Sequence, residues 1–237
     1  MDAVRQLTNL LYFMLGMLVG SQAKLRYDSH HQPHPRPYPW RRLLEHPWRL
    51  WYRKPGETVD QFGLKPQMTV LELGCGTGLF TVEIAQRLGE DGRLHVVELQ
   101  EPYLRQAQQR VSQAGLQARV HFHHSGAYAL PIENDSIDLV VVIATLAQIP
   151  ERAVALSELR RVLKPGARLV ISEELPDPAY VPPVVMRRWL ANAGYRPIGQ
   201  SGTPFCYSQF YITDKEINTI DVIAKATERV TVVSPKH

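Results

Sequence analysis

The sequence has 237 residues, 44% of them hydrophobic and 21% charged, with a formal net charge of +4. A chain of this size can bury one sizeable core but not obviously two, which fits a single domain with extra pieces. Its two cysteines, Cys75 and Cys206, have no metal-ligand spacing and argue against a disulfide framework, which agrees with a reducing compartment.

The first expected element is an apolar helix over residues 1–23. Its centre, residues 10–19, is uncharged and apolar on every helical face. A helix that spans the hydrocarbon layer needs about twenty apolar residues, so the segment falls short and is closer to an interfacial helix or a signal core. We expect a retained membrane anchor. A cleaved signal, with Ser21-Gln22-Ala23 as its cleavage site, and a buried core helix are the alternatives.

Residues 24–55 are expected to form a basic, aromatic linker or interfacial segment. Between residues 24 and 54, eight basic side chains stand against two acidic ones, and three of the four tryptophans fall here. Indoles and arginines beside an apolar helix suit a headgroup layer, so the predicted partner is a membrane surface with anionic lipid. Positive charge on this side of the helix predicts that the rest of the chain is cytoplasmic. Nucleic acid is the less favoured partner.

Alternating prolines predict that residues 29–39 form an extended, stiff linker between the helix and the domain. His30, His31 and His34 lie there without cysteine or carboxylate companions, and no metal site is predicted.

A glycine-rich turn follows. Residues 68–73 read as a buried strand and residues 79–88 have helical periodicity, which places Gly74, Gly76 and Gly78 at the junction. Glycines at a strand-to-helix turn let a ligand approach bare backbone, and the free amides of the helix start favour an anionic group.

Further strands and helices succeed one another. A second strand, 93–97, ends in Glu98, and a third ends in a histidine cluster whose His121 and His123 share one face by alternation. A fourth strand covers 136–143, and a helix, a turn and a fifth strand cover 158–171. A proline-broken loop, 173–180, leads to an amphipathic helix near 182–193, an antiparallel hairpin over 199–213 and a tail, 214–237.

The pattern Glu72-x-Gly-x-Gly-x-Gly resembles motif I of the class I S-adenosylmethionine-dependent methyltransferases. A dinucleotide fingerprint would need glycine where Leu79 stands. The fourth strand with Asp138 and the Leu163-Lys164-Pro165-Gly166 turn resemble the quinone-biosynthesis branch of that family. The resemblance implies an α/β, Rossmann-like, seven-stranded sheet with helices on both faces, spanning residues 56–213.

The resemblance also implies S-adenosylmethionine as cofactor, with Glu98 accepting hydrogen bonds from the ribose hydroxyls and Leu99 against the adenine. The implied cofactor-binding residues are Glu72, Gly74, Cys75, Gly76, Thr77, Gly78, Glu98, Leu99, Gln100, Gly126, Ala127, Ile143 and Ala144. Ligands of such sheets bind beyond the carboxyl ends of the strands. The expected substrate-binding residues are therefore Thr145, Gln148, Glu173 and Tyr180.

Two departures limit what the resemblance implies. Relatives carry Gly-Asp-Ala where Ser125-Gly126-Ala127 stands here, so the adenine contact comes from elsewhere, such as the backbone or Tyr128. The histidine and acid of the quinone branch are absent after the fourth strand, so no catalytic base is predicted.

We expect a membrane-associated methyltransferase with a hydrophobic or membrane-presented small-molecule or lipid acceptor. The alternatives are a soluble methyltransferase whose N-terminal helix is a pocket lid, and a non-catalytic cofactor-binding protein. The sequence predicts neither the oligomeric state nor the acceptor atom.

Overall fold

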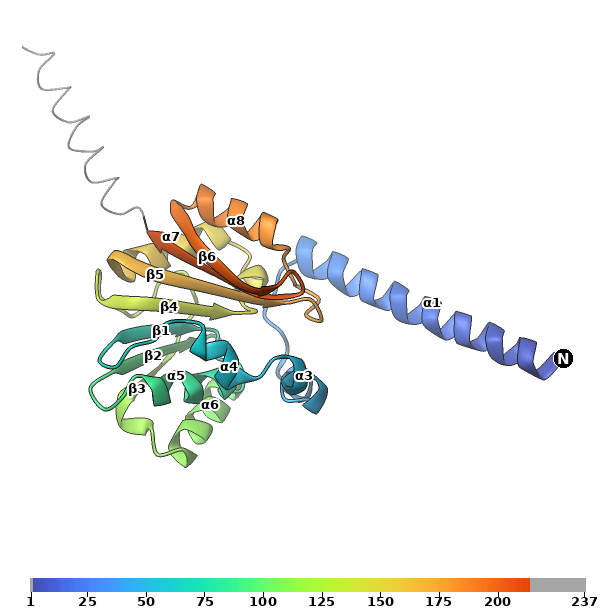
Figure 1. Ribbon diagram of the computed structural model, residues 1–237, viewed down its shortest axis with the longest axis horizontal. Coiled ribbons are helices and arrows are strands. Elements are labelled where there is room, and N and C mark those ends of the chain that lie inside the picture. The colour runs from blue at the N-terminus through green and yellow to red at the C-terminus, as the bar shows by residue number, and fades with distance from the viewer. Residues whose placement is uncertain (1, 214–237) are drawn as a thin grey trace, which may run out of the picture.

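The computed structural model describes residues 2–213, without the side chains of residues 2–4 and 18; the predicted tail, 214–237, lies outside the described residues. The described part comprises one mixed sheet with helices on both faces and a long helix that projects from its side (Figure 1).

The predicted seven-stranded sheet is confirmed, with the order β3-β2-β1-β4-β5-β7-β6. The first five strands run parallel, and β7 is antiparallel to both β5 and β6. The strands are β1 (Thr69–Leu73), β2 (Arg93–Glu98), β3 (Val120–His124), β4 (Ile137–Ile143), β5 (Leu163–Glu174), β6 (Tyr195–Thr203) and β7 (Cys206–Thr213).

Helices cover both faces because each parallel strand needs a crossover connection. One core contains Val59, Ile84 and Ala107 from α4, α5 and α6, and the other contains Leu159 and Met186 from α7 and α8. The α-helices are α1 (Asp2–His31), α2 (Arg41–Leu44), α3 (Pro47–Tyr52), α4 (Pro55–Asp60), α5 (Leu79–Arg87), α6 (Glu101–Gln113), α7 (Arg152–Val162) and α8 (Pro183–Asn192). The single-turn helices are η1 (Tyr38–Trp40), η2 (Gln117–Arg119) and η3 (Leu146–Gln148).

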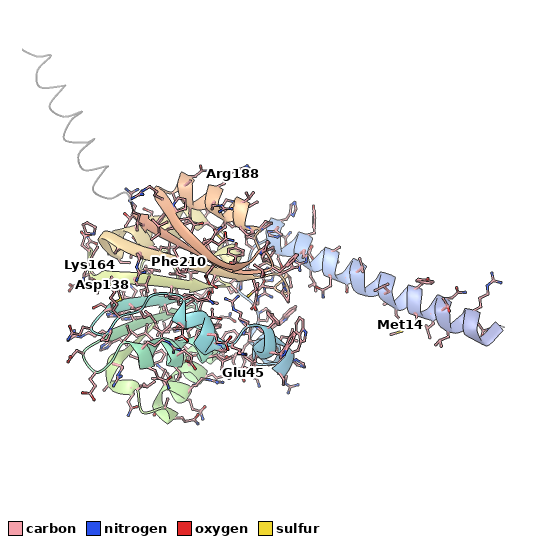
Figure 2. The ribbon with its side chains drawn as sticks, in the orientation of Figure 1. Met14, Glu45, Asp138, Lys164, Arg188 and Phe210 are labelled. Atoms are coloured by element: carbon pink, nitrogen blue, oxygen red, sulfur yellow. The ribbon has the colours of Figure 1, made fainter. Side chains whose placement is uncertain are left out.

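Asp138 joins the amino-terminal ends of three central strands. Its carboxylate accepts a hydrogen bond from the Thr69 backbone N–H at 2.8 Å and from Lys164 Nζ at 2.6 Å (Figure 2). The predicted turn, residues 163–166, lies within β5, where residues 164–167 form an irregular stretch between the pairings of Ile137 with Leu163 and of Leu139 with Arg168. Asp138 therefore fixes the register at the edge of the sheet opposite the ligand-binding edge.

The histidines of β2 and β3 stack on one face of the sheet. The His95 ring lies 5.3 Å, centroid to centroid, from both His121 and His123. The prediction that His121 and His123 share a face is therefore confirmed.

Helix α1 is longer than predicted. It continues to His31, because Lys24 pairs with Asp28 and the Tyr27 ring stacks on His31, each four residues apart. Residues 29–31 are consequently helical and not extended.

The apolar part of α1 is exposed. Large side chains from Leu7 to Val19 are 54–70% accessible, and Met14 projects into solvent from the extended helix (Figure 2). The alternative of a buried core helix is therefore wrong for this part of the chain. Within the described residues, no helix is both long and apolar enough to cross a membrane.

Candidate active site

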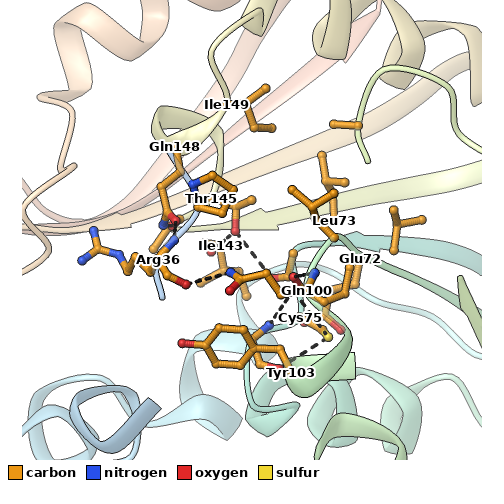
Figure 3. A pocket seen from close by; sticks show the side chains of 18 of the residues that line it. Arg36, Glu72, Leu73, Cys75, Gln100, Tyr103, Ile143, Thr145, Gln148 and Ile149 are labelled. Atoms are coloured by element: carbon orange, nitrogen blue, oxygen red, sulfur yellow. Dashed lines mark hydrogen bonds between the residues drawn. The ribbon is translucent and has the colours of Figure 1, made fainter. Parts of the chain in front are cut away.

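A cavity of about 250 Å³ lies at the carboxyl ends of β1, β2 and β4. Every predicted cofactor-binding residue except Gly78 lines it. Thr145 and Gln148, two of the four predicted substrate-binding residues, line it as well (Figure 3).

The three glycines of the turn have different reasons to be glycine. All three have positive φ, between 51° and 80°. A Cβ on Gly74 would overlap the Thr145 side chain, and a Cβ on Gly78 would lie 2.7 Å from Ala107 Cα of α6. A Cβ on Gly76 would meet only Leu44 Cδ1, at 3.4 Å. Gly74 and Gly78 thus allow the turn to pack, and Gly76 borders the cavity.

Glu98 connects the end of β2 to this turn. Its Oε2 accepts a hydrogen bond from the Gly76 N–H at 3.3 Å, and its Oε1 accepts one from the Gln100 N–H at 2.9 Å. Burial raises the pKa of Glu98, and these backbone donors oppose the rise. Glu98 lines the cavity beside the glycine turn, which fits the predicted binding of ribose hydroxyls.

Glu72 is a second buried carboxyl group at the same end. Thr81 Oγ1 donates a 2.6 Å hydrogen bond to Glu72 Oε2. The pKa of Glu72 is raised to about 8, chiefly by burial; the Thr81 hydrogen bond opposes this rise and the nearby charge of Glu98 adds to it. A cationic ligand favours the ionised form of such a carboxyl group, so Glu72 and Glu98 together fit a molecule that carries positive charge near a ribose.

The roof of the cavity consists of residues that were not predicted to belong to the site. Residues 32–53, here called the strap, pack over the ligand-binding edge, and Pro35, Arg36, Leu44 and Arg49 line the cavity. Gln100 Nε2 donates to the Arg36 carbonyl oxygen at 2.7 Å, and the Arg36 N–H donates to Gln148 Oε1 at 3.0 Å (Figure 3). The strap is thus bonded to both a predicted cofactor residue and a predicted substrate residue.

Helix α1 does not form that roof, because none of its described residues lines the cavity. The alternative in which the N-terminal helix is the pocket lid is therefore not borne out by the described residues of α1; the strap that follows the helix covers the cavity instead.

Two predicted substrate-binding residues lie outside the cavity lining. Glu173 is buried inside β5, opposite Tyr207, and the Tyr180 hydroxyl donates to the Pro204 carbonyl oxygen. The predicted loop at 173 fails because β5 continues to Glu174. Asp177, in the same stretch of chain, lines the cavity and was not predicted.

The basic side chains of the strap meet acids of the domain. Arg49 Nη2 lies 2.7 Å from Glu174 Oε1, and Arg53 Nη1 lies 3.8 Å from Glu174 Oε2. The Tyr52 hydroxyl donates a 2.9 Å hydrogen bond to Glu174 Oε2. Although burial opposes it, the two arginines hold the pKa of Glu174 below its usual value. Arg36 pairs with Asp177.

These pairs withdraw part of the basic segment from its predicted contact with lipid. Arg49 and Arg53 are buried and neutralised inside the protein, so they are not available to anionic lipid. The aromatic side chains behave as predicted for an exposed surface, since Trp48 is 57% and Trp51 76% accessible.

No acidic side chain stands at residues 125–127, where relatives carry the acid that contacts the adenine. Ser125, Gly126, Ala127 and Tyr128 all line the cavity, so backbone groups and the Tyr128 ring are available at the position where relatives carry the acid.

The chain is similar to one protein family and to several known enzymes. The family model described as "Methyltransferase domain" matches residues 64–185, just over half of the 237 residues. A demethylmenaquinone methyltransferase from Lactiplantibacillus plantarum is 39% identical over 129 residues, which is 54% of each chain. A ubiquinone/menaquinone biosynthesis C-methyltransferase UbiE from Escherichia fergusonii is 32% identical over 125 residues, 53% of this chain and 49% of that protein. The chain spans about half the length of these curated relatives.

Solved structures are similar in fold. A SAM dependent methyltransferase from Aquifex aeolicus matches with a TM-score of 0.69 at 26% identity, over 75% of this chain and 99% of that one. The [4+2]-cyclase SpnF matches with a TM-score of 0.55 at 21% identity, over 62% and 57% of the two chains. The second likeness, at 21% identity, shows the shared fold alone, since the protein is named as a cyclase.

Proposed function

The chain belongs to the methyltransferase domain family, and from this premise we propose that it transfers the methyl group of S-adenosylmethionine to a hydrophobic, quinone-like acceptor. The observation that carries the proposal is the cavity, which joins the glycine turn and Glu98 to a roof formed by the strap, where Pro35 and Leu44 are apolar. We propose that the cofactor-binding residues implied by the resemblance bind S-adenosylmethionine, and their position around this cavity supports it.

The bound cofactor would supply an electrophilic sulfonium methyl group. The chain's own task is then mainly to position two reactants and exclude water. Glu98 would accept hydrogen bonds from the ribose, Glu72 would face positive charge, and the Gly76 backbone would allow close approach. The strap would cover the reactants, because its Leu44 and Pro35 side chains close the cavity from above.

The acceptor proposal rests on the apolar lining of the cavity and on the named relatives. Leu44, Ile149 and Pro150 are among the apolar residues that line the cavity, and such a lining suits a flat hydrophobic ring better than a charged metabolite. Demethylmenaquinone and related quinones are named for the relatives' reactions. We extend that chemical class to this chain.

Methyl transfer to a quinone-like ring is tested with a defined acceptor. Purified protein is incubated with S-adenosylmethionine bearing a labelled methyl group and with reduced demethylmenaquinone that carries one isoprene unit. We expect label in the naphthalene ring, located by mass spectrometry. A membrane lipid extract serves as a second acceptor source. Label found solely in water-soluble compounds of a cell extract would exclude the hydrophobic acceptor, and no transfer to any acceptor would favour a non-catalytic binding protein.

We further propose that α1 lies in the membrane interface and that the methyltransferase domain is cytoplasmic. The support is the exposed apolar surface of α1 together with Trp48, Trp51 and Phe205, all of which are more than half accessible. Helix α3, which carries both tryptophans, lies at the end of the molecule from which α1 projects (Figure 1). Phe205 joins β6 to β7 beside the carboxyl end of β5. The cytoplasmic placement follows from positive charge after the apolar helix.

Vesicle flotation tests this membrane association. The full chain is expected to float with vesicles of neutral phosphatidylcholine nearly as well as with vesicles that contain anionic lipid, because Arg36, Arg49 and Arg53 are paired internally. Replacing Leu11 and Leu15 by glutamate is expected to abolish flotation, since charged groups are costly in the apolar layer.

The matched control is Val184→Glu, which changes an exposed apolar residue of α8 away from α1. Equal flotation of both variants would contradict the interfacial role of α1, and strict dependence on anionic lipid would contradict the internal pairing of the strap.

A further inference from the structure

We propose that Asp177 is the catalytic base of this enzyme: it contacts the methyl acceptor and takes the proton of a ring hydroxyl group. This inference rests on the proposed function and names a residue for the step that the sequence left without a base.

Asp177 has one oxygen committed to the protein and one available. Asp177 Oδ1 accepts both the Arg36 guanidinium and the Ala179 backbone N–H, the latter at 2.7 Å. Among residues 2–213, Asp177 Oδ2 accepts no hydrogen bond. The residue is only 9% accessible, yet it lines the cavity. One carboxylate oxygen is therefore fixed, and the other is left for a ligand.

The other polar side chains at this end of the cavity are already engaged. Thr145 Oγ1 donates to the Ile143 carbonyl oxygen at 2.9 Å, and the Gln148 amide bonds to the Ala144 carbonyl oxygen and to the Arg36 N–H. The Tyr128 hydroxyl accepts from the Glu151 N–H at 3.1 Å. Glu72 and Glu98 lie at the glycine turn, where the cofactor is proposed. Asp177 thus remains as the carboxylate for the acceptor.

The charges around Asp177 suit proton transfer. Burial raises the pKa of Asp177, the guanidinium of Arg36 opposes that rise, Glu174 adds to it and Arg49 opposes it. Glu173 is a further acid within electrostatic range, and Arg26 donates to the Asp177 carbonyl oxygen from α1. The net result is a carboxylate that is more basic than an exposed aspartate, as a general base requires.

The proposed step balances in atoms and charge. The acceptor hydroxyl gives its proton to Asp177 Oδ2, and the electron pair of the O–H bond moves into the ring and makes the neighbouring carbon nucleophilic. A C–C bond forms to the methyl group while the S–CH3 bond breaks and its electron pair stays on sulfur. The ring carbon then loses its hydrogen as a proton, the oxygen recovers a proton from Asp177, and one proton is released overall.

The test compares Asp177→Asn with wild type, using reduced demethylmenaquinone with one isoprene unit as the probe. We expect kcat to fall on the order of 100-fold or more, the usual contribution of a general base. The Kd for S-adenosylmethionine, measured by calorimetry, is expected to change less than twofold. Asp60→Asn is the control, because Asp60 is an exposed carboxylate paired with Arg87 outside the cavity.

The pH profile separates a base from a merely structural residue. Wild-type kcat is expected to fall on acidification through the pKa of Asp177, and this fall is the acidic limb of the profile. Asp177→Glu is expected to retain part of the activity and the acidic limb. Asp177→Asn is expected to lose the acidic limb. Unchanged kcat in Asp177→Asn, or an acidic limb that persists in it, would overturn the proposal. If Asp177→Asn does not fold, absence of an acidic limb in wild type overturns it.

Failure of the proposed function can be distinguished from failure of the assignment of Asp177. If wild type methylates neither the probe nor a lipid extract, the methyl acceptor is wrong. The assignment of Asp177 as the base for a ring hydroxyl then falls with that acceptor, whereas transfer by wild type together with unchanged kcat in Asp177→Asn overturns the base alone.

Discussion

Glu98→Ala is expected to weaken the binding of S-adenosylmethionine by a factor on the order of 100 or more. Hydrogen bonds to a charged group are each worth about 1.5–3 kcal/mol, and about 1.4 kcal/mol corresponds to tenfold in affinity. The substitution removes the carboxylate that would receive both ribose hydroxyls. It also removes the acceptor of the Gly76 and Gln100 backbone N–H groups, so the glycine turn loses part of its support.

Calorimetry of cofactor binding measures this effect. Glu101→Ala is the matched control, since Glu101 is an exposed acid only three residues further along and pairs with Arg105 on α6. Its cofactor affinity is expected to equal that of wild type. If Glu98→Ala also binds as wild type does, the assignment of the cofactor site is wrong.

Glu174→Ala is expected to lower the free energy of unfolding by about 3–5 kcal/mol, the usual cost of removing one partner of a buried ion pair. The substitution leaves Arg49 and Arg53 buried close together without a counter-charge. Since the pKa of Glu174 lies below its usual value, its stabilising contribution is present at neutral pH and is lost as the pH falls through that lowered pKa.

Urea denaturation at neutral pH gives the measurement. The control is Glu57→Ala, which breaks the exposed pair with Lys54 and is expected to change the free energy of unfolding by less than about 0.5 kcal/mol. Similar losses in the two variants would mean that the strap is not held to the domain by its arginines.

The glycine turn and the parallel strands could be predicted because their signals are local. The alternation of strand and helix patterns, with Gly74, Gly76 and Gly78 between β1 and α5, determines the sheet edge at which ligands bind. Glu98 follows from the same argument, since it ends the neighbouring parallel strand. All of these relations lie within short stretches of sequence.

The strap could not be predicted because its contacts are distant in sequence. Arg49 and Glu174 are 125 residues apart, and Arg36 and Asp177 are 141 residues apart. A cluster of arginines beside tryptophans has the same composition whether lipid phosphates or buried carboxylates neutralise it. Only the packing of β5 against the strap distinguishes the two, and that packing also brings Asp177 to the cavity in place of Glu173 and Tyr180.

The connection between α1 and the first residues of the strap that line the cavity is short. Residues 32–35 alone separate the end of the helix from Arg36, and four extended residues reach at most roughly 14 Å. Under the proposed interfacial placement of α1, the reaction centre would be held at a short, fixed height above the lipid tails. A substrate could then keep a long isoprenoid chain dissolved in the bilayer while its head group alone rises to react, so turnover would depend little on the length of that chain.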